Sequence, residues 1–396
     1  MRLYCKDLVP PTMTTATVLL VSTATRWIGT ARVPRGLAKA GFDVALLTPR
    51  NSLAEKSRFV ARIAFLPDVT TPLQWVSAFA GTVRATAPRI VVPCDEMAFH
   101  LLQTLVLAPP DDLQSALHLE LSLLIRASLG EPAHYRASVD KTLLPAAAAA
   151  LGVRVPACRN VGAIGEAEAF AHEHGYPVVL KRSHGFAGHG VAICGDAGEL
   201  DAAWRRLCVA DALAPESGAV TRLLVQAFVH GATVSRSTVA WHGRHLAGTT
   251  RERLVRNPPE SGPGSVVRYF HQPEVARFCT MLIEGFGMTG FSGIEFRVEQ
   301  GTGLAYLLEI NRRVTPGVPT SDLVGIDLCA ALHAAATGTA STVPFDVPPG
   351  TDRIIARFPQ EWLRDPNSPN LSQYPVDAPW DDPGVFEAML AMRHEA

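Results

Sequence analysis

Two short segments near residue 300, joined by a glycine-rich turn, restrict the possible folds of this chain more than any other feature. Residues 293–298 read GIEFRV and residues 305–311 read AYLLEIN, with GTG at 301–303 between them. This pattern predicts a β-hairpin. Because side chains alternate along a strand, Glu309 and Asn311 are expected on one face and their apolar neighbours on the other.

The predicted hairpin sets two carboxylates against each other. If the chain folds back about Thr302, Glu295 lies almost opposite Glu309, and like charges in that arrangement destabilise a sheet. Removing one of them would relieve the repulsion, and a divalent cation between them would turn it into attraction. Carboxylate and amide oxygens suit Mg²⁺, which takes a few protein oxygens plus substrate phosphates. Arg312 and Arg313 follow at once, where they would hold an anion beside the metal. An exposed hairpin edge with two solvated glutamates is the alternative.

The composition narrows the classes of function. With 396 residues, of which 47% are hydrophobic and 18% charged, the chain is long enough for two or three domains. A formal net charge of −1 gives no global field that would attract nucleic acid or a membrane. No run of about 18 apolar residues predicts a membrane span, and residues 1–13 do not resemble a signal peptide. Met13 is an alternative start. The seven cysteines contain no C-x-x-C pair, which fits a reducing cytoplasm.

The first part of the chain predicts an open α/β domain over residues 14–125. Residues 17–22 are a near-continuous apolar run, typical of a parallel strand buried on both faces. A helix ending at residue 39 and strands over 43–47 and 90–93 follow. Ligands of such domains lie beyond the carboxyl ends of the strands. There, Arg26, Asp95 and Glu96 are either substrate contacts or solvated loop charges. The loop after the first strand has no G-x-G-x-x-G, and the chain has no P-loop motif.

From about residue 130 the pattern predicts a second, α+β domain over residues 130–340. A helix is expected to start near Lys141 and to run through the alanine-rich tract 146–150. Residues 341–396 are proline-rich and are expected to pack on the surface, with a short helix at 384–393. Further predicted elements are helices at 166–174 and 199–213 and strands at 177–181, 191–193 and 223–229.

The segment 183–190 joins two of the predicted strands and contains three glycines and two histidines. Glycine lets backbone N–H groups approach phosphate oxygens closely, and Lys181, just before the segment, would add a positive charge. A plain flexible loop with solvated histidines is the alternative.

The order of these parts resembles the ATP-grasp superfamily of ATP-dependent carboxylate ligases. Lys141 comes first, then Lys181 with its glycine loop, then the strand 223–229, and last the hairpin with its two glutamates. The strongest match is LEINRR at 308–313, followed by VVLK at 178–181. The resemblance covers residues 130–340 and, more loosely, the preceding domain. It implies an N-terminal α/β domain, a two-lobed ATP-grasp domain with a lid at about 153–225, and a C-terminal tail.

The resemblance also implies roles for individual residues. Lys181 and Arg313 are the catalytic positions, and Arg313 would steady an acyl phosphate. The loop that includes residues 258–265 would close over substrate. Positions implied for ATP are Lys141, Lys181, His184, Gly185, Gly188, Gly190, Gln226, Ala227, Val229 and Thr233. Positions implied for Mg²⁺, with Mn²⁺ as an alternative, are Glu295, Glu309 and Asn311. Positions implied for substrate are Arg26, Asp95, Glu96, Arg251, Arg253 and Ser265.

Two positions depart from the family pattern. Many members carry a glutamate in the segment that reads adenine, where this chain has Gln226 and Ala227. The acidic residue that often holds the ribose falls near Thr233, which carries no charge. Recognition of adenine by the backbone survives both changes, so they bear on nucleotide affinity and choice rather than on ATP use.

The resemblance implies an ADP-forming ligase that joins a carboxylate to an amine through an acyl phosphate. Its partners would be small-molecule carboxylates and amines, without nucleic acid or membrane, and a homodimer is common in the family. Two alternatives remain, a carboxylase or carbamoyl-phosphate type of enzyme that uses bicarbonate, and a nucleotide-binding module without turnover. Cys94 is interpreted as a buried structural thiol because no histidine stands beside it as a base.

Overall fold

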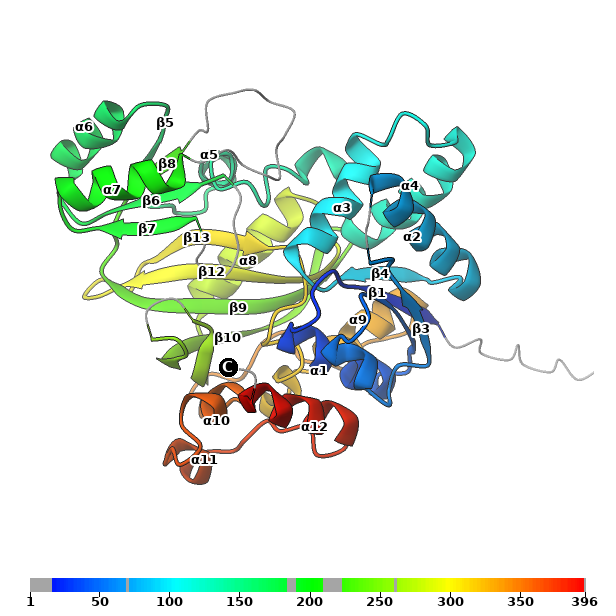
Figure 1. Ribbon diagram of the computed structural model, residues 1–396. Coiled ribbons are helices and arrows are strands. Elements are labelled where there is room, and N and C mark those ends of the chain that lie inside the picture. Colours follow the sequence, from blue (N-terminus) through cyan, green and yellow to red (C-terminus); the bar gives the residue numbers. More distant parts are fainter. Residues whose placement is uncertain (1–15, 69–70, 184–189, 209–222, 260–261, 395–396) are drawn as a thin grey trace, which may run out of the picture.

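The computed structural model of the chain describes residues 16–68, 71–183, 190–208, 223–259 and 262–394. Within them the chain forms three sheets (Figure 1), of which one is parallel and two are antiparallel. No helix in these ranges is both long and apolar enough to cross a membrane. The predicted mixture of an open α/β part and an α+β part is confirmed.

The N-terminal sheet has the strand order β3-β2-β1-β4, and its strands pair in parallel. Strand β1 is buried along its whole length, as its apolar run predicts, because helices cover both faces of the sheet. The strands are β1 (Thr17–Val21), β2 (Asp43–Thr48), β3 (Arg62–Phe65) and β4 (Ile90–Pro93). The helices are α1 (Ile28–Lys39), α2 (Pro72–Thr86), α3 (Glu96–Leu107) and α4 (Ser115–Leu129), with a 3₁₀ turn η1 (Leu53–Lys56).

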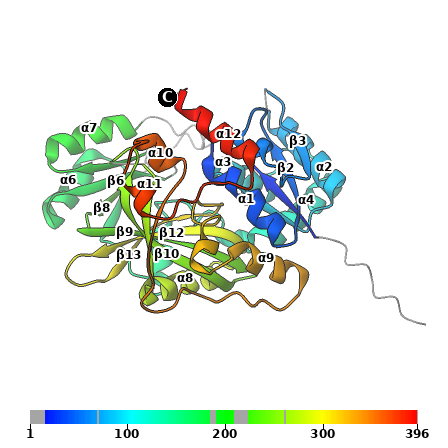
Figure 2. The same cartoon turned by 90° about the horizontal axis from the view of Figure 1, so that it is seen from below.

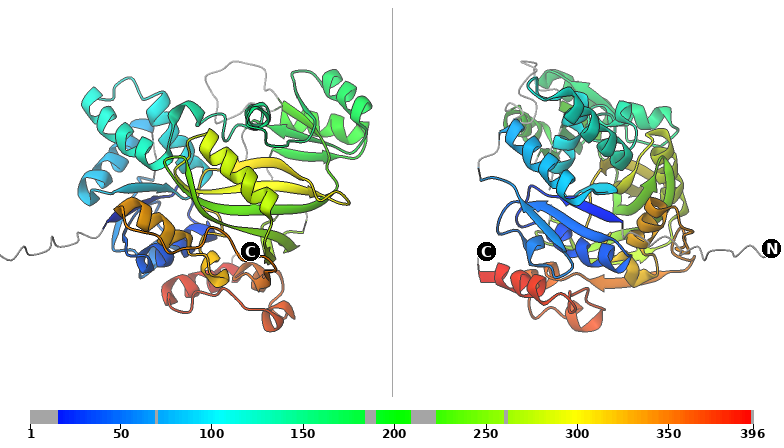
Figure 3. Two further views of the ribbon diagram at one scale, coloured as in Figure 1. Left: turned by 180° about the vertical axis from the view of Figure 1, so that it is seen from behind. Right: turned by 90° about the vertical axis from the view of Figure 1, so that its right-hand side faces the viewer.

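The central sheet has the order β13-β12-β9-β10-β11-β14 and is antiparallel throughout. Helices α8 (Pro273–Gly285) and α5 (Leu144–Ala150) bury one of its faces in a hydrophobic cluster, and Figure 3 shows α8 lying across the sheet. The strands are β9 (Gly231–Trp241), β10 (Arg244–Arg256), β11 (Gly264–Phe270), β12 (Gly290–Glu299), β13 (Ala305–Asn311) and β14 (Asp352–Ala356).

The third sheet forms a small lobe of its own, with the strand order β5-β8-β6-β7. Helices α6 (Ile164–His174) and α7 (Ala197–Leu207) pack on one hydrophobic cluster of this sheet. The strands are β5 (Cys158–Val161), β6 (Val178–Arg182), β7 (Val191–Cys194) and β8 (Leu223–Ala227). The predicted strands and helices of the lid region are therefore confirmed, although α7 ends before the expected residue 213, which lies outside the described residues.

The helix expected from Lys141 starts later than predicted. Asp140 accepts hydrogen bonds from the backbone N–H and the hydroxyl of Thr142, both at 2.7 Å, which closes a local turn in place of a helical one. Helix α5 then begins at Leu144, with Pro145 in its first turn. Lys141 thus lies on a turn, which leaves its backbone N–H to donate to the carbonyl of Ser183 at 2.9 Å.

The C-terminal segment does more than pack on the surface. Strand β14 pairs with β11 and completes the central sheet, which the proline-rich composition did not predict. Helix α12 (Pro383–Ala391), close to the expected helix at 384–393, packs with α1 and η1, as Figure 2 shows. Remaining elements are η2 (Pro132–His134), η3 (Ser321–Val324), α9 (Leu328–Thr337), α10 (Gln360–Arg364), α11 (Asn370–Gln373) and η4 (Met392–His394). The domain limits at residues 125, 130 and 340 stay predictions.

Candidate active site

A row of polar side chains crosses four strands of the central sheet. In register, Glu309 pairs with Glu295, Glu295 pairs with Ser235, and Ser235 pairs with Arg251. Directly paired residues point to the same side of an antiparallel sheet. The opposite side carries apolar residues such as Ile294, which are buried under α8 and α5. The row therefore lies on the face opposite α8 and α5, and the predicted opposition of the two glutamates is confirmed.

Both glutamates have cationic partners of their own. Arg253 donates a hydrogen bond to Glu295, and the Lys141 ammonium lies 3.5 Å from a carboxylate oxygen of Glu309. The amide nitrogen of Asn311 donates to the other oxygen of Glu309 at 3.2 Å. The expected repulsion between the two carboxylates is therefore offset by neighbouring cations, which sequence reasoning did not foresee.

Lys181 brings the small lobe into this cluster. It is a buried residue of β6 and interacts electrostatically with Glu309 and Lys141. Burial lowers the pKa of Lys181 to about 8, although Glu309 opposes the shift. Burial alone would raise the pKa of Glu309, but Lys141, Asn311 and Lys181 outweigh it and hold that pKa below its ordinary value. The carboxylate is therefore ionised at neutral pH, as a metal ligand must be.

Arg313 links the central sheet to the carboxyl edge of the N-terminal sheet. Its guanidinium donates to Glu96, the first residue of α3, and lies 4.9 Å from the ring centre of Trp27, just before α1. The backbone N–H of Val314 donates to the carbonyl of Pro93, the last residue of β4, at 3.1 Å. Two residues predicted separately, Arg313 and Glu96, thus meet, and Trp27 was missed because nothing local in the sequence marks it.

Arg251 is the last member of the row, on β10, and is buried. Its guanidinium donates to the hydroxyl of Ser237 at 2.7 Å, and that hydroxyl lies 2.8 Å from the hydroxyl of Thr315. Burial lowers the pKa of Arg251 to about 10. Gly317 makes this position possible, because a Cβ there would lie 1.9 Å from a guanidinium nitrogen of Arg251.

Thr233 lies among arginines that the sequence did not single out. Its hydroxyl accepts hydrogen bonds from Arg297 at 2.9 Å and from Arg256 at 3.1 Å. The guanidinium of Arg297 also lies 5.0 Å from the ring centre of Phe228, directly after β8. The position where the family pattern has an acid is therefore bordered by positive charge.

The other predicted residues have varied surroundings. Asp95 is buried and caps α3 through the N–H of Ala98 at 2.8 Å, while it also binds the backbone and hydroxyl of Thr23 at 2.7 Å. The fold accounts for Asp95 in this way, and its role as a substrate contact stays a prediction. Arg26 is exposed, Ser265 is buried in β11, Gln226 is buried in β8, and Ala227 and Val229 are half-buried at the end of that strand. Gly190 has φ of +92°, whereas His184, Gly185 and Gly188 lie outside the described residues.

The donor set fits a hard divalent cation. Among the described residues, no group of three or more His, Cys, Asp and Glu side chains could hold a metal. The site offers two carboxylates and one amide oxygen, from Glu295, Glu309 and Asn311. Mg²⁺ commonly binds one or two carboxylates and completes its shell with waters and substrate phosphates. The remaining positions would therefore come from waters and from the phosphates of the nucleotide.

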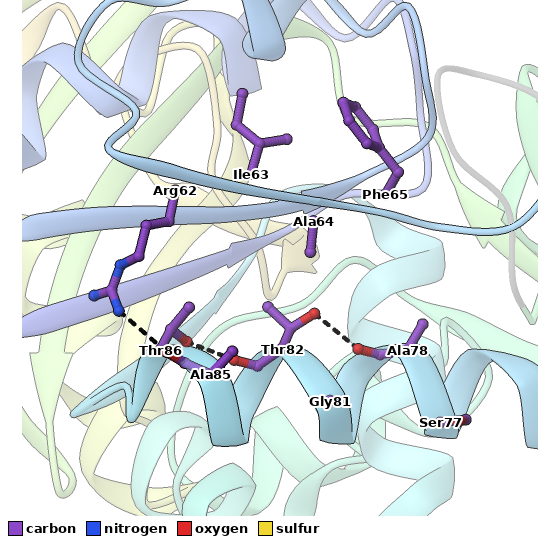
Figure 4. A pocket seen from close by; sticks show the side chains of 10 residues that line it. All are labelled: Arg62, Ile63, Ala64, Phe65, Ser77, Ala78, Gly81, Thr82, Ala85 and Thr86. Carbon is purple, nitrogen blue, oxygen red and sulfur yellow. Dashed lines mark hydrogen bonds between the residues drawn. The ribbon is translucent and has the colours of Figure 1, made fainter.

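Cys94 is not a candidate nucleophile. The thiol is fully buried, and burial raises its pKa far above the ordinary value, so the interpretation as a structural thiol is confirmed. A separate shallow pocket lies between β3 and α2 (Figure 4), lined by Ile63, Phe65 and Gly81 among others. It is at the β3 edge of the N-terminal sheet, and none of the site residues lines it.

Two family models match parts of the chain. Residues 219–354 match a family described as ATP-grasp in the biosynthetic pathway with Ter operon. Residues 140–234 match the ATP-binding domain of the carbamoyl-phosphate synthase L chain. Together these matches assign residues 140–354 to ATP-grasp families, and the resemblance seen in the sequence is confirmed.

Individual relatives and solved structures share low sequence identity with this chain. The carbamoyl phosphate synthase large chain of Hyperthermus butylicus is 27% identical over 199 residues, which is 48% of this chain and 18% of the relative. The chain thus spans less than a fifth of that relative's length. The biotin carboxylase domain dimer of Hydrogenobacter thermophilus 2-oxoglutarate carboxylase, solved with MgADP, ADP and bicarbonate, has a TM-score of 0.62 at 17% identity, covering 84% of this chain and 73% of that one. The L-amino acid ligase of Bacillus licheniformis has a TM-score of 0.57 at 16% identity, covering 82% and 75%. Identities this low bear on the fold alone.

Proposed function

We propose that this protein is an ADP-forming, ATP-dependent ligase that joins a small-molecule carboxylate to an amine through an acyl phosphate. One observation carries the proposal. Glu295 and Glu309 lie opposite each other on the face of the central sheet away from α8 and α5, and Lys141 and Lys181 both interact with Glu309. Two carboxylates for a hard cation beside two ammonium groups for phosphates form a site suited to phosphoryl transfer.

The nucleotide would lie between the small lobe and the central sheet. Lys141 and Lys181 would bind phosphate oxygens, and the backbone from Ala227 to Val229 would read adenine at the end of β8. We retain Gly190 and the preceding loop positions as part of the phosphate site. Because Thr233 is held by Arg256 and Arg297, we expect the ribose side of the site to favour negative charge, unlike a site with an acid there.

A bound divalent cation would neutralise phosphate charge at Glu295, Glu309 and Asn311. The protein's own side chains do the remaining work by positioning. Arg253 fixes the orientation of Glu295. Arg313 contacts Glu96 and Trp27, and we expect its guanidinium to bind the acyl phosphate and the tetrahedral species formed when the amine attacks.

A bicarbonate-using enzyme is the second candidate, since a similar structure was solved with MgADP and bicarbonate. That neighbour is a dimer, and a homodimer is also part of our proposal for this chain. A cytoplasmic location completes the proposal, consistent with six free cysteines among the described residues.

The test is ADP release with a panel of carboxylates and amines, and separately with bicarbonate. We expect release that needs a divalent cation, a carboxylate and an amine together. Release that needs bicarbonate and no other carboxylate would favour the second candidate. Nucleotide binding without any release would overturn both and favour a binding module.

A further inference from the structure

Two arginines, Arg251 in the row and Arg357 close enough to repel it, are buried with no carboxylate at ion-pair distance among the described residues. Arg251 is 6% exposed and Arg357, which follows β14, is 5% exposed. Arg251 donates to a neutral hydroxyl, that of Ser237. Arg357 donates to the carbonyls of Gly264 at 3.3 Å and Pro316 at 3.0 Å, and its Nε has no partner. Within the described ranges, no acidic side chain forms an ion pair with either of them.

The carboxylates nearby are already committed to other arginines. Glu295 pairs with Arg253 and Glu96 pairs with Arg313. The third, Asp377, lies 3.3 Å from Arg32 and also accepts the backbone N–H of Phe358 at 2.5 Å. The cluster therefore contains more guanidinium groups than carboxylates.

This excess of buried positive charge needs an explanation. Burying a charge without a counter-ion is costly, and buried charges in proteins are normally paired. The fold nevertheless makes room for the Arg251 guanidinium, because Gly317 has no Cβ that would fill its position. Arg357 and Arg253 also repel Arg251, which adds to the lowering of its pKa by burial. A ligand that brings its own anion would supply the missing charge.

We propose that Arg251 and Arg357 bind an oxyanion, a carboxylate or a phosphate, carried by the substrate at a second position besides the reacting group. This proposal rests on the ligase function above. Arg251 and Glu295 belong to the same row and are separated by two strand spacings. Their backbones are therefore roughly 10 Å apart. The substrate would therefore be small, with an anionic group at one end and the reacting carboxylate or amine at the other, as in an amino acid or a phosphorylated metabolite.

Binding of simple anions tests this without relying on turnover. The melting temperature would be measured with malonate, with its neutral analogue malonamide and with inorganic phosphate, each in saturating MgADP at constant ionic strength. We expect malonate or phosphate to raise it and malonamide to leave it unchanged. Arg251→Met should abolish the rise, whereas Arg277→Met on α8, whose side chain is 60% exposed, should retain it. An equal rise with malonamide, or a full rise in Arg251→Met, would overturn the proposal. If malonate alone raises the melting temperature, the anionic group of the substrate is a carboxylate. If phosphate alone raises it, that group is a phosphate.

Two further variants separate the site from folding. Arg251→Met should melt at or above the wild-type temperature without ligand, because it removes an unpaired buried charge. Arg357→Lys keeps the charge and should fold, but it should show a smaller rise because it lacks the planar fork of donors. With a substrate found by ADP release, Arg251→Met should raise the KM of that substrate about tenfold, a typical effect of one charge-assisted hydrogen bond, and leave the KM of ATP within about twofold. An unchanged substrate KM would refute the inference while leaving the ligase proposal intact. Absence of ADP release with any substrate would refute the ligase proposal, and the anion shifts would still report on the two arginines.

Discussion

Replacing Glu309 with glutamine separates the charge of this residue from its shape. In the structure the carboxylate lies 3.5 Å from the Lys141 ammonium and also interacts with Lys181. At an effective dielectric constant of about 20, unit charges at this distance attract by about 5 kcal/mol. Desolvation of both groups cancels much of that. We therefore expect the free energy of unfolding to fall by about 1–3 kcal/mol, between the values typical of exposed and of buried ion pairs.

This expectation reverses the sign that sequence reasoning gave. Two opposed glutamates alone would repel, so that losing one would stabilise the fold, but Lys141, Lys181 and Arg253 make the surroundings of Glu309 net attractive. Urea unfolding at neutral pH measures the effect, with Glu284→Gln on α8 as the matched control because that side chain is exposed. ADP release at saturating Mg²⁺ should be nearly abolished. A variant as stable as wild type would refute the electrostatic reasoning, and activity within about threefold of wild type would refute the metal assignment.

Three other predictions follow from the same cluster. Lys181→Ala should raise the KM of ATP strongly, because its phosphate contact is made in ground and transition states alike. Arg313→Ala should act mainly on kcat, and the opposite pattern in steady-state kinetics would show that the two roles are exchanged. The folded pKa of Lys181, about 8, is below its ordinary 10.5, so the unfolded chain binds more protons between these values and the contribution of Lys181 to stability should rise with pH across that window. Urea unfolding from pH 8 to 10.5 should show this rise reduced in Lys181→Met, and equal slopes would contradict it. Gly317→Ala should displace Arg251, since the new Cβ would lie 1.9 Å from its guanidinium; melting and substrate KM should both worsen, and wild-type values for both would contradict the packing.

The hairpin and its register could be predicted because they depend on local information. Alternation along residues 305–311 and the position of the glycine turn fix which residues oppose each other, and the structure confirms the pairing of Glu295 with Glu309. Lys181 was found for a similar reason, because it lies near the end of β6, shortly before the glycine-rich segment. Both features lie within about 20 residues of the signal that identifies them.

The contacts that complete the site come from distant parts of the chain. Arg313 meets Glu96 across 217 positions, and only the packing of two domains brings them together. Thr233 was noted for lacking a charge, but Arg256 and Arg297 reach it from other strands. The sequence did not predict a role for Arg357, because the prolines of its segment suggested a surface tail. The pairing of β14 with the central sheet depends on tertiary structure. Lys141 was assigned to the wrong local structure, because Asp140 and Thr142 close a turn, and its contact with ATP phosphates stays a prediction.

Detection of the acyl phosphate tests the proposed function most directly. With ATP, Mg²⁺ and the correct carboxylate but no amine, hydroxylamine should trap a hydroxamate, since we propose that Arg313 holds an acyl phosphate. The Cys94 thiol does not replace that intermediate as a nucleophile, because it is buried and its pKa is raised. A carboxylate labelled with ¹⁸O should pass one label into inorganic phosphate, with ADP as the other product. Label in AMP, or release of pyrophosphate, would mean that the carboxylate attacks the α-phosphorus, and the proposed ADP-forming ligase mechanism would then be wrong.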